Sequence, residues 1–306
     1  VAREPKSVEA HSLLGAFYLA KRDVAQAERE FKVVADLAPI GSAARLKLVD
    51  FYLTAQKPDE AKRIVSEITQ KAPDSMPAWH RLAQIAFAER NYDESLRALK
   101  PILKKNPSDL DGHFLQGRVR LAKGETTEAI QEFQQVLKLE PRFAPARYEL
   151  ALAHLQTGNL QQAKAELKEA TSIAPNYIEA TLLLADLNLQ SGALQPAIED
   201  LEKFVARQPG LLQAHTLLGT AYLFKGEPVK ATEAFRKIVA LEPKNPRGPY
   251  LVGMGLRAQG KSAQAKQEFE AAIALAPAYI EPLTQLVDMA LLEKRPDAAL
   301  NRVTKQ

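Results

Sequence analysis

Residues 147–157 read Arg147-Tyr-Glu-Leu-Ala-Leu-Ala-His-Leu-Gln-Thr157, and Gly158-Asn159 separates them from a second run at 160–173. In both runs apolar residues recur every three or four positions, which is the period of an amphipathic α-helix. A glycine directly after a helical run is typical of a left-handed helix cap. The stretch therefore predicts two helices joined by a tight turn.

The same pattern recurs along the whole chain with a period of 34 residues. Nine of the 19 prolines fall on a single phase of this period. They are Pro5, Pro39, Pro73, Pro107, Pro141, Pro175, Pro209, Pro243 and Pro277. A fixed period of about 20–50 residues indicates a solenoid or another repeat architecture.

We number each repeat so that this proline is position 32. Three further positions then carry side chains of similar size from repeat to repeat. Position 20 is small: Ala27, Ala61, Ser95, Ala129, Ala163, Ala197, Ala231, Ala265 and Ala299. Position 8 is small or valine: Gly15, Val49, Ala83, Gly117, Ala151, Ala185, Gly219, Gly253 and Val287. Position 24 is large and apolar: Phe31, Val65, Leu99, Phe133, Leu167, Leu201, Phe235, Phe269 and Val303. Small residues at 8 and 20 allow two antiparallel helices to approach closely, and the large residue at 24 fills the adjacent space.

Glycine and proline mark the predicted helix ends. Position 15, directly after the first helix, is glycine in five repeats: Gly124, Gly158, Gly192, Gly226 and Gly260. Pro58, Pro228 and Pro296 open second helices, where the missing N–H has no cost. Pro101 alone falls late in a second helix, and we expect a kink or an early helix end there.

This signature of small 8, alanine 20, large 24 and proline 32 resembles the tetratricopeptide repeat (TPR) family over the whole chain. The resemblance implies an all-α, right-handed superhelix of helix–turn–helix repeats. The full repeats are 8–41, 42–75, 76–109, 110–143, 144–177, 178–211, 212–245 and 246–279. The aromatic residue that the family often has at position 11 is present only as Tyr18, Tyr52 and Tyr222, and tryptophan at position 4 only as Trp79.

Both ends of the chain fall inside a repeat. Residues 1–7 match the end of a preceding repeat, and residues 280–306 supply a partial ninth. The last predicted helix, around Asp297–Lys305, has no polar capping helix after it, although natural arrays usually end in one. We hypothesise that the chain is a segment of a longer array.

Composition and motifs favour a binding protein over an enzyme, and no cofactor site is expected. Without cysteine there is neither a disulfide nor a thiolate metal site. Residues 255–262 match the P-loop spacing, but a predicted helix precedes them where that motif needs a strand. His11, His113 and His215 share position 4 of repeats three apart, too distant to hold one metal ion. No serine lies in a recognisable catalytic motif.

The family resemblance assigns ligand contacts to positions 2, 5, 9, 12 and 13 of the first helices, on the concave surface. Seven acidic residues and three basic residues occupy those positions, whereas the whole chain has a net charge of +4. The acidic set is Glu9, Asp50, Asp111, Glu179, Asp186, Glu281 and Asp288, and the basic set is Arg118, Arg247 and Arg257. This distribution favours a neutral or basic polypeptide and disfavours nucleic acid, which needs a basic track.

Ring-bearing side chains occupy position 5 in three successive repeats, as His80, Phe114 and Tyr148. Two interpretations are open: these rings form a peptide groove, with Arg118 available to a partner carboxylate or to the peptide backbone, or they only cover neighbouring helices and nothing docks there. Tyr250 repeats the pattern later in the chain, near Phe224, Met254 and Arg257. The predicted groove residues are His80, Gln84, Asp111, Phe114, Arg118, Tyr148, Asp186, Phe224, Tyr250, Met254 and Arg257. The Lys/Asn set of the family's carboxylate clamp is absent.

The predicted function is that of a non-catalytic protein-interaction scaffold, with no membrane span in this segment. The strict 34-residue spacing over many repeats resembles that of long bacterial arrays of cell-envelope and exopolysaccharide-export systems, including the TPR lipoproteins of PEP-CTERM systems. Periplasm or envelope is therefore favoured over cytoplasm. Two alternatives stay open: the recognition arm of a larger enzyme such as a glycosyltransferase, and self-association through uncapped end repeats.

Overall fold

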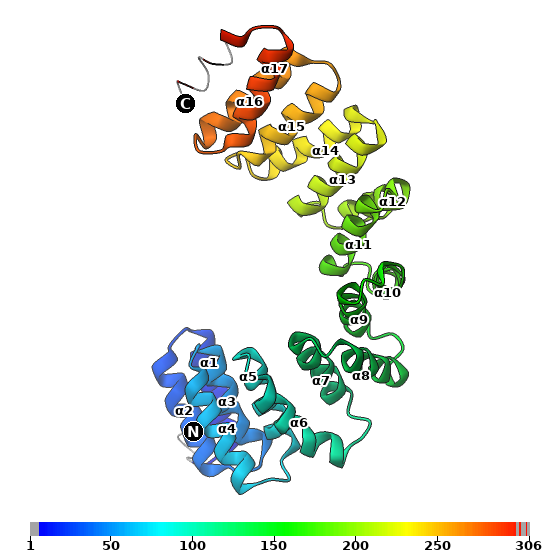
Figure 1. Ribbon diagram of the computed structural model, residues 1–306. Helices are drawn as coiled ribbons and strands as arrows, with labels where there is room; N and C mark the ends of the chain where they lie inside the picture. The colour runs from blue at the N-terminus through cyan, green and yellow to red at the C-terminus, as the bar shows by residue number, and fades with distance from the viewer. Residues whose placement is uncertain (1–5, 298–299, 301–303, 305–306) are drawn as a thin grey trace. The chain divides into compact units, whose positions relative to one another are not determined.

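The computed structural model describes residues 6–297 together with 300 and 304, and the chain forms two compact units that meet between Ala163 and Lys164. The part that it describes contains helices and no strand, arranged within each unit as consecutive helical hairpins (Figure 1). In unit 1 the helices are α1 (Val8–Ala20), α2 (Val24–Leu37), α3 (Ala43–Thr54), α4 (Pro58–Lys71), α5 (Met76–Ala88), α6 (Tyr92–Lys105), α7 (Leu110–Lys123), α8 (Thr126–Leu139) and α9 (Ala144–Gln156). Helix α10 (Leu160–Ile173) spans the division, and unit 2 continues with α11 (Ile178–Gln190), α12 (Leu194–Arg207), α13 (Leu212–Lys225), α14 (Pro228–Leu241), α15 (Arg247–Ala258), α16 (Ser262–Leu275) and α17 (Ile280–Leu292).

The helices follow the predicted 34-residue phase. Each of the eight full repeats contributes one first helix and one second helix, and α17 is the first helix of the ninth. The all-α TPR fold expected from the sequence is thereby confirmed. The expected last helix around Asp297–Lys305, the repeat-end match at residues 1–5 and the expected packing residues Ala299 and Val303 lie almost entirely outside the described residues.

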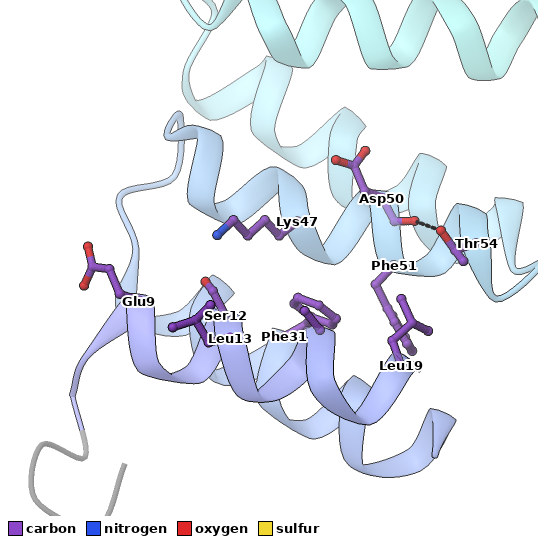
Figure 2. Close-up of a pocket in the computed structure, with 10 residues that line it drawn as sticks. Glu9, Ser12, Leu13, Leu19, Phe31, Lys47, Asp50, Phe51 and Thr54 are labelled. Atoms are coloured by element: carbon purple, nitrogen blue, oxygen red, sulfur yellow. Dashed lines mark hydrogen bonds between the residues drawn. The ribbon is translucent and has the colours of Figure 1, made fainter. Parts of the chain in front are cut away.

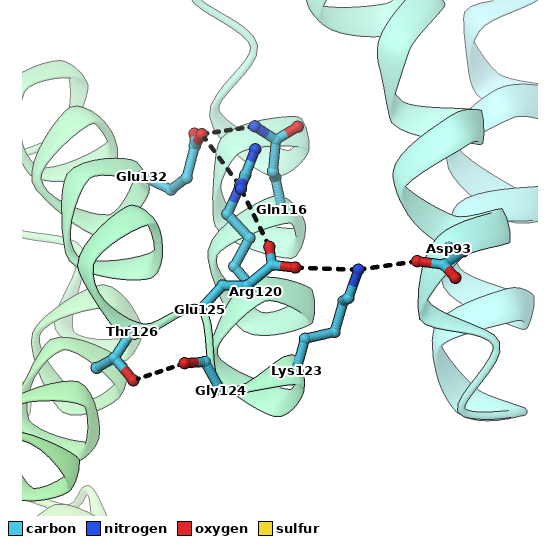
Figure 3. Close-up of polar contacts among 8 residues, drawn as sticks. All are labelled: Asp93, Gln116, Arg120, Lys123, Gly124, Glu125, Thr126 and Glu132. Carbon is cyan, nitrogen blue, oxygen red and sulfur yellow. Dashed lines mark hydrogen bonds and ion pairs between the residues drawn. The ribbon is translucent and has the colours of Figure 1, made fainter.

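Position 15 has the left-handed conformation in every repeat. The five glycines at this position have φ between 75° and 80°. Figure 3 shows one of them, Gly124, at the turn between α7 and α8. Four repeats without glycine adopt the same conformation: Arg22, Gln56, Arg90 and Lys294 have φ between 58° and 61°. The turn is therefore set by the geometry of the hairpin, and glycine only lowers the energy of a conformation that the other residues also accept.

Within a hairpin, the side chain at position 8 of the first helix and the side chain at position 24 of the second helix are complementary in size. A Cβ added to Gly117 would lie 2.5 Å from Cε1 of Phe133, and one added to Gly253 would lie 2.6 Å from Cε1 of Phe269. Every glycine at position 8 faces phenylalanine in this way, the other pairs being Gly15–Phe31 and Gly219–Phe235. Where position 24 is Leu or Val, position 8 is Ala or Val instead, as in Ala83–Leu99, Ala151–Leu167, Ala185–Leu201 and Val49–Val65.

Position 20 has one exception to alanine, and its hydroxyl is satisfied. Ser95 is fully buried, and its Oγ donates a hydrogen bond of 2.8 Å to the carbonyl oxygen of Ala83 at position 8. Because a buried hydroxyl without a partner is costly, this bond explains why serine can replace alanine at so close a contact.

In several repeats the residue at position 4 contacts the carbonyl oxygen of the proline that precedes the hairpin. The Trp79 indole donates to the carbonyl oxygen of Pro73 over 2.8 Å, and the Arg147 guanidinium donates to Pro141 over 3.2 Å. His113 and His215 make the same contact, each with Nε2 2.9 Å from the carbonyl oxygen of the proline six residues earlier. Tryptophan, histidine and arginine share a nitrogen donor that reaches this carbonyl oxygen, so His113 and His215 have a structural role.

Pro101 corrects one sequence expectation. Helix α6 continues through it to Lys105 and has the same 14-residue length as the other second helices, so the predicted early end is wrong. The last turn of α6 still closes normally, with the Asn106 N–H donating to the Ile102 carbonyl. The packing of Leu99 and Ile102, both buried, holds the helix on the core of unit 1 and offsets the hydrogen bond that proline cannot donate.

Candidate functional site

The first helices of unit 1 bring the predicted groove residues onto neighbouring elements. Helix α5 contacts α7, and α7 contacts α9, so His80, Phe114 and Tyr148 lie on three successive neighbours. Beside them the side chains of Gln84 and Asp111 are exposed. The order and adjacency expected from the repeat phase are therefore present.

The rings of this series pack mainly within the protein. Phe114 makes an edge-to-face contact with Phe143, with ring centroids 5.2 Å apart, and lies 6.1 Å from the core ring of Phe133. His80 approaches Asp109, with 3.3 Å between Nε2 and Oδ1. These side chains and Tyr148 are only partly accessible, so a partner meets their edges and not their full faces.

Arg118 is engaged by its own chain. Its Nε lies 3.0 Å from Oε1 of Glu149, and its guanidinium lies 4.8 Å from the ring centroid of Phe87. Burial raises the pKa of the Glu149 carboxyl, and Arg118 opposes that shift. A partner carboxylate therefore has to compete with Glu149, which is a constraint that the sequence did not reveal.

Some of the groove residues predicted in unit 2 pack within the protein, and others are exposed. Tyr250 and Met254, both on α15, pack against the core of this unit, and Tyr250 contacts Tyr279 edge-to-face at 5.4 Å. Arg257, also on α15, donates to Gln285. Asp186 on α11 accepts a 2.7 Å hydrogen bond from Gln190. Phe224, at the end of α13, is 66% exposed.

The negative charge counted on the first-helix positions is partly neutralised. Oδ1 of Asp50 lies 2.5 Å from Nε of Arg81 in an ion pair. Arg81 stands at position 6 and is therefore not among the charges counted at positions 2, 5, 9, 12 and 13. Arg81 also donates to Gln84 over 2.8 Å. The face is therefore less acidic than the sequence positions alone indicate.

A separate feature of this face is an open pocket of about 480 Å³ between α1 and α3 (Figure 2). Its lining residues are Glu9, Ser12, Leu13, Ala16, Leu19, Phe31, Lys47, Asp50, Phe51 and Thr54. Six of them stand at the ligand-contact positions that the family resemblance assigns, namely Glu9, Ser12, Ala16, Leu19, Asp50 and Thr54. Sequence reasoning counted Glu9 and Asp50 as groove carboxylates but missed the pocket.

The pocket combines an apolar wall with one isolated hydroxyl. Phe31 and Phe51 form its base, with ring centroids 5.4 Å apart, and Leu13 is 73% exposed at its edge. Ser12 is only 6% exposed, and its Oγ has no hydrogen-bond partner. The sequence did contain a signal for the cavity, because Ser12 and Ala16 are the smallest pair of residues at positions 5 and 9 in any repeat.

Other kinds of site receive no support within the described residues. They contain no group of three or more His, Asp or Glu side chains arranged to hold a metal ion. None of the described helices is long and apolar enough to cross a membrane. The P-loop-like segment runs from α15 through the turn at Gly260 into α16, so helix precedes it.

Comparison with known proteins gives a consistent family assignment. Two family models described as tetratricopeptide repeat match residues 22–85 with 120–187 and residues 80–142 with 182–246. Curated proteins give no match.

Among solved structures, YrrB, described as a TPR protein with an unusual peptide-binding site, is 16% identical with a TM-score of 0.54. That match covers 61% of this chain and 97% of YrrB. A TPR protein from Parabacteroides merdae is 14% identical with a TM-score of 0.52, covering 83% of this chain and 97% of its own. MamA from Desulfovibrio magneticus is 22% identical with a TM-score of 0.49, covering 56% and 96% respectively.

Proposed function

Because this chain belongs to the tetratricopeptide repeat family, we propose that it is a non-catalytic scaffold that binds a polypeptide along its first-helix face. One observation carries the proposal. Successive first helices of unit 1 are neighbours, and they hold His80, Phe114 and Tyr148 at one repeat position beside exposed polar side chains. The close contact within the hairpins is made by positions 8, 20 and 24, and on this face the edges of the rings and the side chains of Gln84 and Asp111 are accessible.

The spacing suits an extended peptide. Packed helices lie roughly 8–10 Å apart, and an extended chain rises about 3.3 Å per residue. Every third side chain of a peptide can therefore meet the next first helix. Gln84 and Asp111 supply polar contacts at the edge, and the ring edges of Phe114 and Tyr148 supply apolar contact area.

Charge supports a neutral or basic partner. Asp111 is exposed and has no ion pair among the described residues, whereas the nearby Arg118 is occupied by Glu149. In unit 2 the corresponding residues of the proposal are Asp186, Phe224, Tyr250, Met254 and Arg257. An acidic partner or a nucleic acid meets no free basic track at the residues proposed for unit 1.

The test uses a displayed library of random 12-residue peptides selected against the whole chain. We expect enriched peptides to lose at least tenfold in affinity when Phe114 and Tyr148 are both changed to Ala. Because Phe114 also packs on Phe133, Asp111→Ala serves as a second variant whose exposed position leaves the fold intact. The matched control is the pair Gln131→Ala and Gln134→Ala on α8, both exposed on a second helix. Retention of full affinity in both groove variants removes these residues from the proposal.

The cellular setting is a further part of the proposal. We propose that the scaffold belongs to a bacterial envelope or secretion-related protein, and this proposal rests on the repeat sequence alone. Fractionation of cells that express the tagged full-length protein tests this: recovery in the cytosolic fraction contradicts it. The recognition-arm alternative requires a catalytic domain in the same polypeptide.

A further inference from the structure

The pocket between α1 and α3 exists because two side chains are small. At position 5 Ser12 stands where later repeats of unit 1 have Leu46, His80, Phe114 and Tyr148, and at position 9 Ala16 stands where they have Asp50, Gln84, Arg118 and Leu152. These two small side chains enlarge an open pocket of about 480 Å³ above Phe31 and Phe51. That volume lies in the range of about 300–1,000 Å³ typical of ligand sites.

The Ser12 hydroxyl indicates that this space receives a polar group as well as an apolar one. It is more than nine-tenths buried and lines the pocket, where Figure 2 places it between α1 and α3. Its Oγ has no hydrogen-bond partner in the folded chain. A buried hydroxyl is normally satisfied, and an unsatisfied one is often explained by a missing ligand or water.

The charges at the edge select among apolar ligands. Glu9 is exposed without an ion pair among the described residues, and Asp50 is held at one oxygen by Arg81. Lys47 supplies one positive charge on the α3 side. A fatty acid or another acyl carboxylate brings its charge towards two carboxylates, whereas a peptide brings a neutral backbone and can add a basic side chain beside Glu9.

We propose that this pocket anchors one large apolar side chain, such as Phe, Met or Leu, of the polypeptide partner. The partner's main-chain N–H donates to Ser12 Oγ, and a neighbouring Lys or Arg lies against Glu9. This proposal rests on the proposed function, which it deepens by fixing where the partner is held and what residue it presents. Ser12 and Ala16 are then specificity-determining residues, because larger side chains at those positions close the pocket.

The experiment uses the same displayed 12-residue peptide library, selected against the whole chain and then measured against single variants. Ala16→Phe fills the pocket from an exposed position, and Ala25→Phe on α2 is the matched control at an exposed position of a second helix. We expect enriched peptides to share one large apolar residue next to a basic residue. We also expect Ala16→Phe to weaken them at least tenfold, with no effect from Ala25→Phe.

Ser12→Ala gives a readout that a structural role does not produce. Because the Oγ has no partner in the free chain, thermal unfolding of Ser12→Ala should occur at the wild-type temperature or above it. Loss of one hydrogen bond should nevertheless weaken the peptides by about three- to tenfold. Lower thermal stability together with unchanged peptide affinity overturns the role assigned to Ser12.

The outcomes separate the two proposals. If no peptide is enriched by the wild-type chain, the polypeptide-binding function itself fails. If peptides are enriched and lose affinity in the Phe114→Ala, Tyr148→Ala variant but not in Ala16→Phe, the function stands and the pocket proposal is overturned. Enriched peptides without a large apolar residue overturn the pocket proposal as well.

Discussion

The complementarity between positions 8 and 24 allows a quantitative prediction at Gly117 and Phe133. In Gly117→Ala the new Cβ lies 2.5 Å from Cε1 and 2.8 Å from Cδ1 of Phe133, whereas carbon atoms in contact prefer about 3.5–4.0 Å. The ring has to move by roughly 1 Å, and Phe133 is fully buried beside the ring of Phe114. Overpacking of this kind costs ~1–3 kcal/mol. Replacing a helical glycine by alanine returns about 1 kcal/mol.

The net expectation for Gly117→Ala is a loss of about 0–2 kcal/mol in the free energy of unfolding. Phe133→Leu should lose roughly 2 kcal/mol, because it removes fewer buried carbons than Phe→Ala. The double variant recreates the Ala–Leu pair present at Ala83 and Leu99. We expect it to lie within ~1 kcal/mol of wild type, which gives a favourable coupling energy of about 2 kcal/mol.

Urea unfolding followed by circular dichroism and by the fluorescence of Trp79, the single tryptophan, measures these values. The analysis needs a nearest-neighbour treatment, because repeat arrays seldom unfold in one step. Ala83→Gly is the matched control: its partner is Leu99, so glycine should only destabilise. An additive double variant, or a Gly117→Ala chain that gains the full ~1 kcal/mol expected from helix propensity alone, refutes the size-matching argument.

Three further predictions concern the turn and two carboxyl groups. Arg90→Gly should raise the free energy of unfolding by ~0.5–1 kcal/mol, because Arg90 has φ of 60°. Gly124→Ala should lower the free energy of unfolding by a similar amount, because Gly124 has φ of 80° and no atom lies within 4 Å of the added Cβ. Chemical unfolding measures both changes. The hydrogen bond from Lys32, with further bonds from Lys57 and Tyr52, outweighs the cost of burial and lowers the pKa of Glu28 from 4.5 to about 2. The stabilising contribution of Glu28 is therefore present above pH 4.5 and is lost as pH falls towards 2. The stability deficit of Glu28→Gln, measured by thermal unfolding, should shrink over that range. Burial raises the pKa of the Glu149 carboxyl above 4.5, so its contribution to the free energy of unfolding is complete at low pH and is lost as pH rises through the folded-state pKa. Glu149→Gln should therefore gain stability relative to wild type as pH rises from 4.5, and a constant difference contradicts this assignment.

The repeat architecture could be predicted from sequence because its causes are local and periodic. The spacing of apolar residues specifies which side of each helix is buried, and the glycine at position 15 and the proline at position 32 specify where helices end. Even the four repeats without glycine follow the same turn, since the geometry of the hairpin imposes it. Pro101 shows the limit of a local rule, because buried neighbours keep α6 helical through it.

The candidate site depended on contacts that no local pattern specifies. The sequence placed Phe114 and Arg118 on the first-helix face, but only the tertiary structure showed that Phe114 packs on Phe143 and that Arg118 is held by Glu149. Those partners lie about 30 residues away, and their distance depends on how successive hairpins pack. The pocket beside Ser12 follows the same logic, because a cavity is an absence of side-chain atoms between two helices. The chain therefore determined by itself where helices lie and which faces they bury, whereas only the packing of neighbouring repeats decided which exposed side chains are free to bind.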